Sequence, residues 1–161
     1  MKKVFVSMLV ALILLIAIAG VALASPGQKQ LPLKGSLHAV ENNEVDWPII
    51  YVHGSGSGHA TILGKFSVTY EAVVHNDENG VGTASPSAHF VTADGDSLFA
   101  EGSGVGVPTE TPGVNRIMEE YTITGGTGRF AGATGSFTVE RLINLATGVT
   151  DGTIEGKIVL P

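Results

Sequence analysis

The sequence predicts an all-β domain that folds as an eight-stranded antiparallel closed barrel, preceded by an export signal. Apolar runs alternate with turn residues at the spacing of short strands, and no stretch after residue 24 carries the apolar stripe of a helix. Glycines recur inside the expected strands, where they allow the bends by which a sheet closes. Closure also removes exposed sheet edges, an advantage for an exported chain without cysteine.

The first 24 residues have the pattern of a secretory signal peptide. Residues 1–3 include two lysines, residues 4–23 are almost entirely apolar, and Ala-Leu-Ala at 22–24 is a small-residue cleavage site. Cleavage after this site would start the mature chain at Ser25, secreted or periplasmic, with membrane contact only through the signal before cleavage. The alternative is an uncleaved anchor, since about 20 apolar residues can span a bilayer.

The remaining chain has the length of one domain, with a flexible leader at 25–33 and the barrel domain at 34–161. It carries seven basic and 15 acidic residues, a net charge of −8. This balance argues against binding to nucleic acid or to anionic membranes. The absence of cysteine excludes disulfides and lipid attachment at the cleavage site, so the fold depends on its own core.

The expected strands are runs rich in apolar and β-branched residues between turn signals: 35–41, 49–53, 59–75, 82–92, 97–107, 115–124, 135–144 and 152–160. The connecting turns are expected at 42–43, 54–58, 77–80, 94–96, 108–113 and 147–151, together with a central corner described below. Alternation is clearest at 66–72, where Phe66, Val68, Tyr70 and Ala72 share one face and the residues between them are polar. That strand is expected to be buried on one face only.

The most constrained turn is expected at 123–138, whose sequence is ITGGTGRFAGATGSFT. Its glycines allow close backbone approach and positive φ, while Phe130 supplies an apolar anchor. We expect an ordered corner with positive φ at one or more of its first three glycines, and a buried Phe130. The residues assigned to this structural turn are Gly125, Gly126, Gly128, Phe130, Gly132 and Gly135.

Residues 125–135 of this corner resemble the GGTG-[KR]-F turn of plant dirigent proteins and a similar turn in allene oxide cyclase. The resemblance implies an eight-stranded antiparallel barrel and a homo-oligomer, a trimer. The chain also resembles secreted bacterial proteins with the series ATxLGxF, ADGD and GGTGRFAGATG, here at 60–66, 93–96 and 125–135, whose family name implies no activity. The catalytic residues of the two plant families have no matching motif in this sequence, so the resemblance leaves the activity open.

No metal site or cofactor is predicted. The glycine spacing at 124–135 is similar to that of a dinucleotide-binding site, but no helix is expected after it, as such a site requires. The Gly/Ser run at 54–58 does not end in the Lys-Ser/Thr of a phosphate-binding loop. It also does not match the Gly-x-Ser-x-Gly motif around a hydrolase nucleophile. Asp-Gly-Asp at 94–96 is a turn without the remaining ligands of a calcium loop. The histidines have no metal-binding spacing, although His53 and His59 could face each other across 54–58.

One carboxylate falls out of phase with its strand. At 117–123 the odd positions are apolar apart from Glu119, so this side chain lies on the apolar face. A carboxylate there is costly unless it is paired or used. In one interpretation it orients a ligand within the barrel, the ligand-binding residues being Glu119, Tyr121, Phe66, Tyr70 and Arg116. In the other, Glu119 forms a structural ion pair with Arg116 or Arg141.

Three classes of function remain. The first is a secreted binding or interaction module whose barrel holds a small apolar ligand. The second is a structural exported protein with a packed core, and the third, by resemblance, is a cyclase-like or dirigent-like enzyme acting on a hydrophobic or phenolic substrate. We rank them in this order. The few aromatic residues favour a small cavity or tight packing, and a filled interior would argue against both ligand-based classes.

Overall fold

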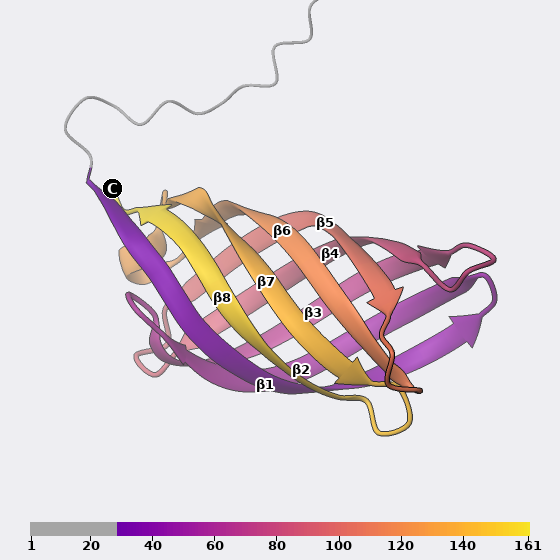
Figure 1. Cartoon of the computed structure of the whole chain (residues 1–161). Helices are drawn as coiled ribbons and strands as arrows, with labels where there is room; N and C mark the ends of the chain where they lie inside the picture. The colour runs from indigo at the N-terminus through magenta and orange to yellow at the C-terminus, as the bar shows by residue number, and fades with distance from the viewer. Residues whose placement is uncertain (1–28) are drawn as a thin grey trace, which may run out of the picture.

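The computed structural model describes residues 29–161, which form a closed barrel of eight antiparallel strands (Figure 1). Each strand pairs with its neighbour in sequence, and β1 pairs with β8 to close the sheet. The expected fold class is therefore confirmed. The predicted signal at 1–24 and the first residues of the predicted leader lie outside the described residues. Within residues 29–161, no helix is long and apolar enough to cross a membrane.

The elements follow one another along the chain with short connections. They are β1 (Gln30–Asp46), β2 (Ile49–Ala60), β3 (Gly64–Asn76), β4 (Gly82–Thr92), β5 (Ser97–Pro108), β6 (Val114–Gly126), the 3-10 turn η1 (Gly128–Phe130), β7 (Thr134–Asn144) and β8 (Val149–Val159). The number and order of the strands match those expected from the sequence.

Several expected boundaries are wrong. A turn at 61–63 divides the expected strand 59–75, and β8 begins at Val149, inside the expected turn at 147–151. Residues 30–33, expected in the leader, belong to β1, and Leu33 is buried. β1 also continues through the expected turn at 42–43 to Asp46. The Gly/Ser run at 54–58, expected as a loop, lies within β2 and pairs along its length with β1 and β3. Its glycines face the barrel interior, where large side chains of the neighbouring strands occupy the space.

Inward-facing glycines lie opposite large inward-facing side chains throughout the barrel. Gly54 pairs with Tyr70, Gly58 with Phe66, Gly102 with Tyr121, Gly104 with Glu119, Gly152 with Arg141 and Gly156 with Phe137. At Gly54 and Gly58, a Cβ atom would overlap the facing aromatic ring. Because protein interiors are closely packed, each large side chain fills the space that the facing glycine leaves empty.

One end of the barrel, here called the corner end, carries the three sequence motifs noted above, at the β2–β3, β4–β5 and β6–β7 connections (Figure 1). The Arg129 backbone N–H donates to the Asp96 carboxylate at 3.3 Å, and its guanidinium Nη2 donates to the carbonyl of Leu63 at 3.3 Å. Phe130 is fully buried, and Gly128 has φ +55°, as expected for this corner. A Cβ at Gly128 would overlap the Asp96 carboxylate, so the turn at 93–96 fits closely against the turn at 125–135.

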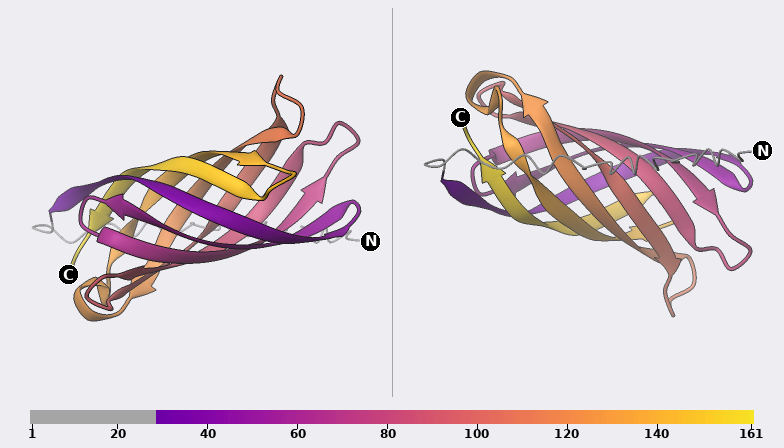
Figure 2. Two further views of the ribbon diagram at one scale, coloured as in Figure 1. Left: turned by 90° about the horizontal axis from the view of Figure 1, so that it is seen from below. Right: turned by 90° about the horizontal axis from the view of Figure 1, so that it is seen from above.

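The opposite end, here called the open end, carries the β1–β2, β3–β4, β5–β6 and β7–β8 connections. Figure 2 shows the β1–β2 and β3–β4 hairpins extending at the end opposite the C-terminus. Between the two ends, the interior holds a chain of aromatic contacts. The Phe66 and Phe90 rings meet edge-on with their centres 5.3 Å apart, and the centres of Phe90 and Phe137 are 5.8 Å apart. The Phe137 ring stacks on Tyr121 with a distance of 5.0 Å between ring centres. These rings form a buried aromatic core.

Candidate functional site

Three charged side chains lie inside the barrel, between the aromatic core and the open end. We call Glu41 of β1, Glu119 of β6 and Arg141 of β7 the inner cluster. Their side chains are only 4%, 4% and 6% exposed. Arg141 Nε donates to Glu119 Oε2 at 3.1 Å and Nη2 donates to Glu119 Oε1 at 3.1 Å. This two-point geometry holds the guanidinium and the carboxylate in one plane.

The second carboxylate of the cluster reaches the same arginine. Arg141 Nη1 donates to Glu41 Oε1 at 2.5 Å and also contacts the hydroxyl of buried Thr150 at 3.4 Å. Asn43 Nδ2 donates to the other oxygen of Glu41 at 3.1 Å. In the described residues no buried side-chain nitrogen or oxygen lacks a partner, so the cluster is fully hydrogen-bonded.

Tyr70 joins the inner cluster across a glycine. Gly54 of β2 pairs with Glu41 on one side and with Tyr70 on the other. Because Gly54 has no side chain, the Tyr70 ring crosses β2, and its hydroxyl donates to Glu41 Oε1 at 3.1 Å. The Arg141 guanidinium carbon lies 5.1 Å from the centre of the same ring, within the range of a cation–π contact.

The environment of the cluster favours the charged arginine and neutral tyrosines. Burial alone would lower the pKa of Arg141, but Glu119 and Glu41 outweigh it and hold the pKa above its ordinary value. Burial raises the pKa of Tyr70 well above its ordinary value, and Glu41 adds to this effect while Arg141 opposes it. Burial and the charge of Glu119 likewise raise the pKa of Tyr121. The cluster thus contains one cation and two acidic side chains in a site that excludes most water.

The space between these residues is nearly filled. A cavity of only about 10 Å³ is lined by inner-cluster and core residues, among them Tyr70, Glu119, Tyr121 and Arg141. A cavity needs roughly 10–15 Å³ to hold one water molecule. At this point the interior can accept at most one water and no organic ligand.

The structure brings together four of the five side chains expected to line the interior. Phe66, Tyr70, Glu119 and Tyr121 are all buried and face inward. Glu119 pairs with Arg141, which was one of its two expected partners.

Placing Arg116 inside the barrel was wrong. Its side chain is 55% exposed, and its Nε lies 3.6 Å from Glu140 Oε1 on the outer face. Arg116 is three residues from Glu119, and positions an odd number apart on a strand point to opposite faces.

Sequence reasoning missed Glu41 as a member of the inner cluster. It lies two residues beyond inward-facing Ala39, so alternation along the strand places it on the inner face. The expected strand ended at Glu41, and its last residue was not considered as part of the interior. Thr150 was also missed, because it was assigned to the turn before the last strand.

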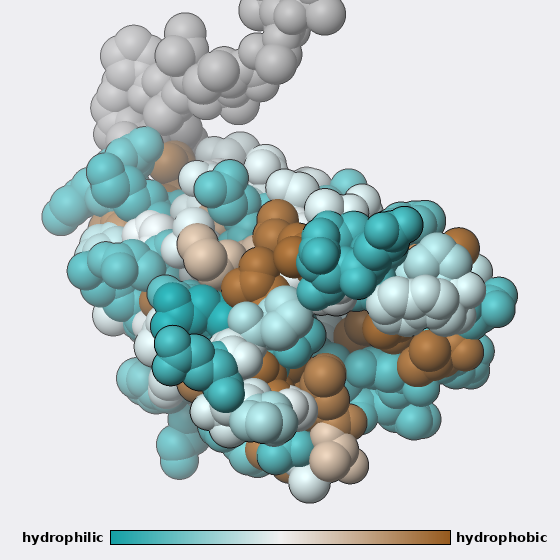
Figure 3. Space-filling view, turned by 45° about the vertical axis from the view of Figure 1, so that its right-hand side comes forward, coloured by the Kyte–Doolittle hydropathy of each residue, from teal (hydrophilic) through white to brown (hydrophobic). Residues whose placement is uncertain are grey.

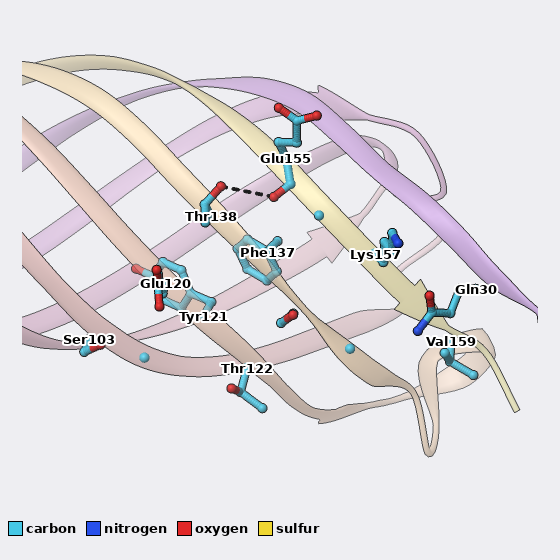
Figure 4. Close-up of a pocket in the computed structure, with 14 residues that line it drawn as sticks. Gln30, Ser103, Glu120, Tyr121, Thr122, Phe137, Thr138, Glu155, Lys157 and Val159 are labelled. Atoms are coloured by element: carbon cyan, nitrogen blue, oxygen red, sulfur yellow. Dashed lines mark hydrogen bonds between the residues drawn. The ribbon is translucent and has the colours of Figure 1, made fainter. Parts of the chain in front are cut away.

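The outer face carries shallow polar hollows. One, of about 710 Å³, runs across β5 to β8 and is shown in Figure 4. Thr122, Ser136 and Thr138 line it, together with Glu155 and Lys157. Thr138 donates from its hydroxyl to the Glu155 carbonyl at 3.2 Å. The hollow follows from the small side chains of this face, and its polar groups are open to solvent.

The histidines do not form a metal site. His53 and His59 both lie on β2, and His53 Nδ1 lies 3.5 Å from Glu71 Oε1 on the outer face. Among residues 29–161, no three His, Asp or Glu side chains are arranged to hold a metal ion. Asp96, considered as a calcium ligand, instead holds the corner through its contact with Arg129.

Comparison with protein-family models, curated proteins and solved structures found no match. The eight-stranded barrel therefore rests on the structure itself, and no family is identified.

Proposed function

We propose that this chain is an exported β-barrel module that acts through its outer surface, as an interaction protein with a packed, ion-paired interior. The observation that carries this proposal is the filled interior. The inner cluster satisfies its own charges, and the cavity beside it is about 10 Å³. Ligand pockets in proteins are commonly 300–1,000 Å³, roughly thirty times larger or more.

The same observation weakens the other two interpretations. A small apolar ligand held between Tyr70, Glu119 and Tyr121 would have to displace side chains that are already packed and hydrogen-bonded. An enzyme acting on a hydrophobic or phenolic substrate inside the barrel, as the resemblance to allene oxide cyclase and dirigent proteins implies, would need the same space. We therefore place interaction through the surface first.

Two further features belong to this proposal. The signal pattern at 1–24 supports export, with a secreted or periplasmic location. The outer face carries exposed apolar side chains on neighbouring strands, including Val105 opposite Met118, with Leu142 close by on β7. Contiguous exposed apolar surface of this kind supports contact with another protein surface, including a second copy of the chain.

Benzene binding by the mature protein, residues 25–161, tests the filled interior. The matched variant is Phe137→Ala, because removing a buried ring creates a cavity, and dry apolar cavities of about 150 Å³ bind benzene. We expect the variant to bind benzene in NMR titrations and the wild-type protein to show no saturable interior shift. Saturable binding to the wild type, with shifts at Tyr70 and Tyr121, would refute the proposal.

A further inference from the structure

The end of β1 has an unpaired backbone edge. β1 pairs with β8 only as far as Val40, opposite Val149. One more bond follows, from the Glu41 N–H to the Gly148 carbonyl at 2.9 Å. β1 then continues to Asp46, paired with β2 alone. We call residues 42–46 the β1 edge; all five are exposed.

The direction of the free backbone groups follows from the bond at Glu41. Both backbone groups of one strand residue point to the same side, and those of the next residue point to the other. Because Glu41 bonds towards β8, the N–H and C=O groups of Asn43 and Val45 point to the same, unoccupied side. The β1 edge therefore offers two donors and two acceptors to an added strand.

The side chains of the edge differ on its two faces. Asn43 bonds to Glu41, which faces the interior, so Asn43 and Val45 lie on the inner face. Val45 is 66% exposed, and Trp47 at the tip of the hairpin is 61% exposed. On the outer face, Glu44 and Asp46 present carboxylates. Figure 3, in which the open end is turned towards the viewer, shows brown apolar patches among teal hydrophilic side chains.

The open end as a whole is acidic. Segments 42–53, 73–84, 105–116 and 142–151 together carry six carboxylates, Glu44, Asp46, Asp77, Glu78, Glu110 and Asp151. Their one Lys or Arg is Arg116, whose Nε already lies 3.6 Å from Glu140 Oε1. A second copy would bring the same carboxylates opposite one another, and like charges in directly opposed positions destabilise strand pairing. The charge at this end therefore favours a basic partner over self-pairing.

We propose that the β1 edge binds an extended, basic segment of a partner protein, which adds to the sheet as a further strand. Its Lys or Arg side chains would lie opposite Glu44 and Asp46, and the alternate apolar side chains would lie beside Val45. The partner pattern is therefore an alternation of basic and apolar residues with period two. This inference rests on the proposed function and names the surface and the partner chemistry.

The probe is a capped, fluorescein-labelled hexapeptide of alternating Lys and Val, followed by fluorescence anisotropy with the mature protein. We expect saturable binding with one peptide per barrel, weakened by 1 M salt because surface charges are then screened. Emission of Trp47, the single tryptophan of the chain, reports on contact near the edge. If the peptide does not bind, or if sedimentation shows that the free protein already pairs through this edge, the proposal is wrong.

Two substitutions separate strand addition from attraction by charge. Val45→Pro removes the backbone N–H of residue 45, which points to the free edge, and leaves the hydrogen bonds to β2 intact. The variant should still fold, because proline is tolerated in a strand where the N–H faces solvent. We expect it to weaken binding at least tenfold. The double change Glu44→Lys with Asp46→Lys should have a similar effect, whereas the control Glu101→Lys on the outer face of β5 should have none.

The peptide provides a second version of the same test, which does not depend on folding of the variants. N-methyl groups on alternate residues of the peptide leave its charge unchanged and remove the N–H donors along one of its edges. Binding of the methylated peptide should therefore fall at least tenfold. Equal binding of the methylated peptide would refute strand addition. None of these outcomes bears on benzene binding in the interior, so failure here and failure of the proposed function are distinguishable.

Discussion

Replacing Arg141 by methionine should remove much of the stability of the barrel. The substitution deletes the only cation of the inner cluster and leaves Glu41 and Glu119, each with a side chain 4% exposed, without their shared partner. Removing one member of a buried ion pair costs about 3–5 kcal/mol, because an uncompensated charge stays buried. Since two carboxylates lose their partner here, we expect a loss of about 4–5 kcal/mol, against a typical total stability of 5–15 kcal/mol.

Urea denaturation followed by circular dichroism measures this loss as a change in the free energy of unfolding. The matched control is Arg116→Met on the outer face, whose pair with Glu140 is exposed on both sides. Exposed ion pairs contribute about 0–1 kcal/mol, so the control should stay within that range.

A compensated variant tests the mechanism behind the loss. Combining Arg141→Met with Glu41→Gln and Glu119→Leu removes every charge of the cluster, and such replacements are often neutral or stabilising. We expect this triple variant to recover most of the stability lost in Arg141→Met. A loss below about 1 kcal/mol in the single variant would refute the reasoning, because the carboxylates would then not depend on Arg141.

Three further predictions concern packing and pH. Gly54→Ala should lower the free energy of unfolding by about 1–3 kcal/mol, since its Cβ overlaps the Tyr70 ring, while the outward-facing control Ser55→Ala should change it by less than about 0.5 kcal/mol in urea melts. Phe130→Ala should cost about 3–5 kcal/mol in the same assay, and a near-neutral result would show that Phe130 does not anchor the corner. The raised pKa values of Tyr70 and Tyr121 favour the neutral form in the folded state. Their stabilising effect is thus complete below the unfolded pKa of about 10 and is lost as pH rises above it. Urea melts should therefore show that the free energy of unfolding falls above about pH 10, and Tyr121→Phe should make this fall smaller. Ionisation of both tyrosines in a still-folded barrel, seen by absorbance at 295 nm, would contradict this prediction.

The sequence was sufficient to predict the strands where alternation and turn residues agree. The face of β3 with Phe66 and Tyr70, the inward phase of Glu119 and the ordered corner around Phe130 all followed from local patterns. Turn spacing and the glycines within strands predicted eight strands and a closed barrel, the resemblance at the corner implied the same fold, and the structure confirms it.

The remaining differences come from contacts between strands that are distant in sequence. The local sequence around Gly54 predicts a loop. A glycine is needed within β2 at this position because the facing Tyr70 ring occupies the space of a side chain. The asparagines at 42–43 read as a turn, but pairing with β2 carries β1 beyond them and brings Glu41 into the interior. Whether the interior was hollow depended on the summed volumes of side chains from all eight strands, which no local pattern contains.

The pairing of β1 with β8 also constrains how the chain folds. Residues 30–40 bond to residues 149–159, so the ladder that closes the barrel joins the two ends of the domain. The barrel cannot close until the whole domain is available, whether it emerges from a ribosome or from an export channel. Contacts of such long sequence separation slow folding, because the entropy of closing a long loop is lost before the ladder forms. A chain with this topology stays open until its last strand arrives, a property that would suit the export we propose for it.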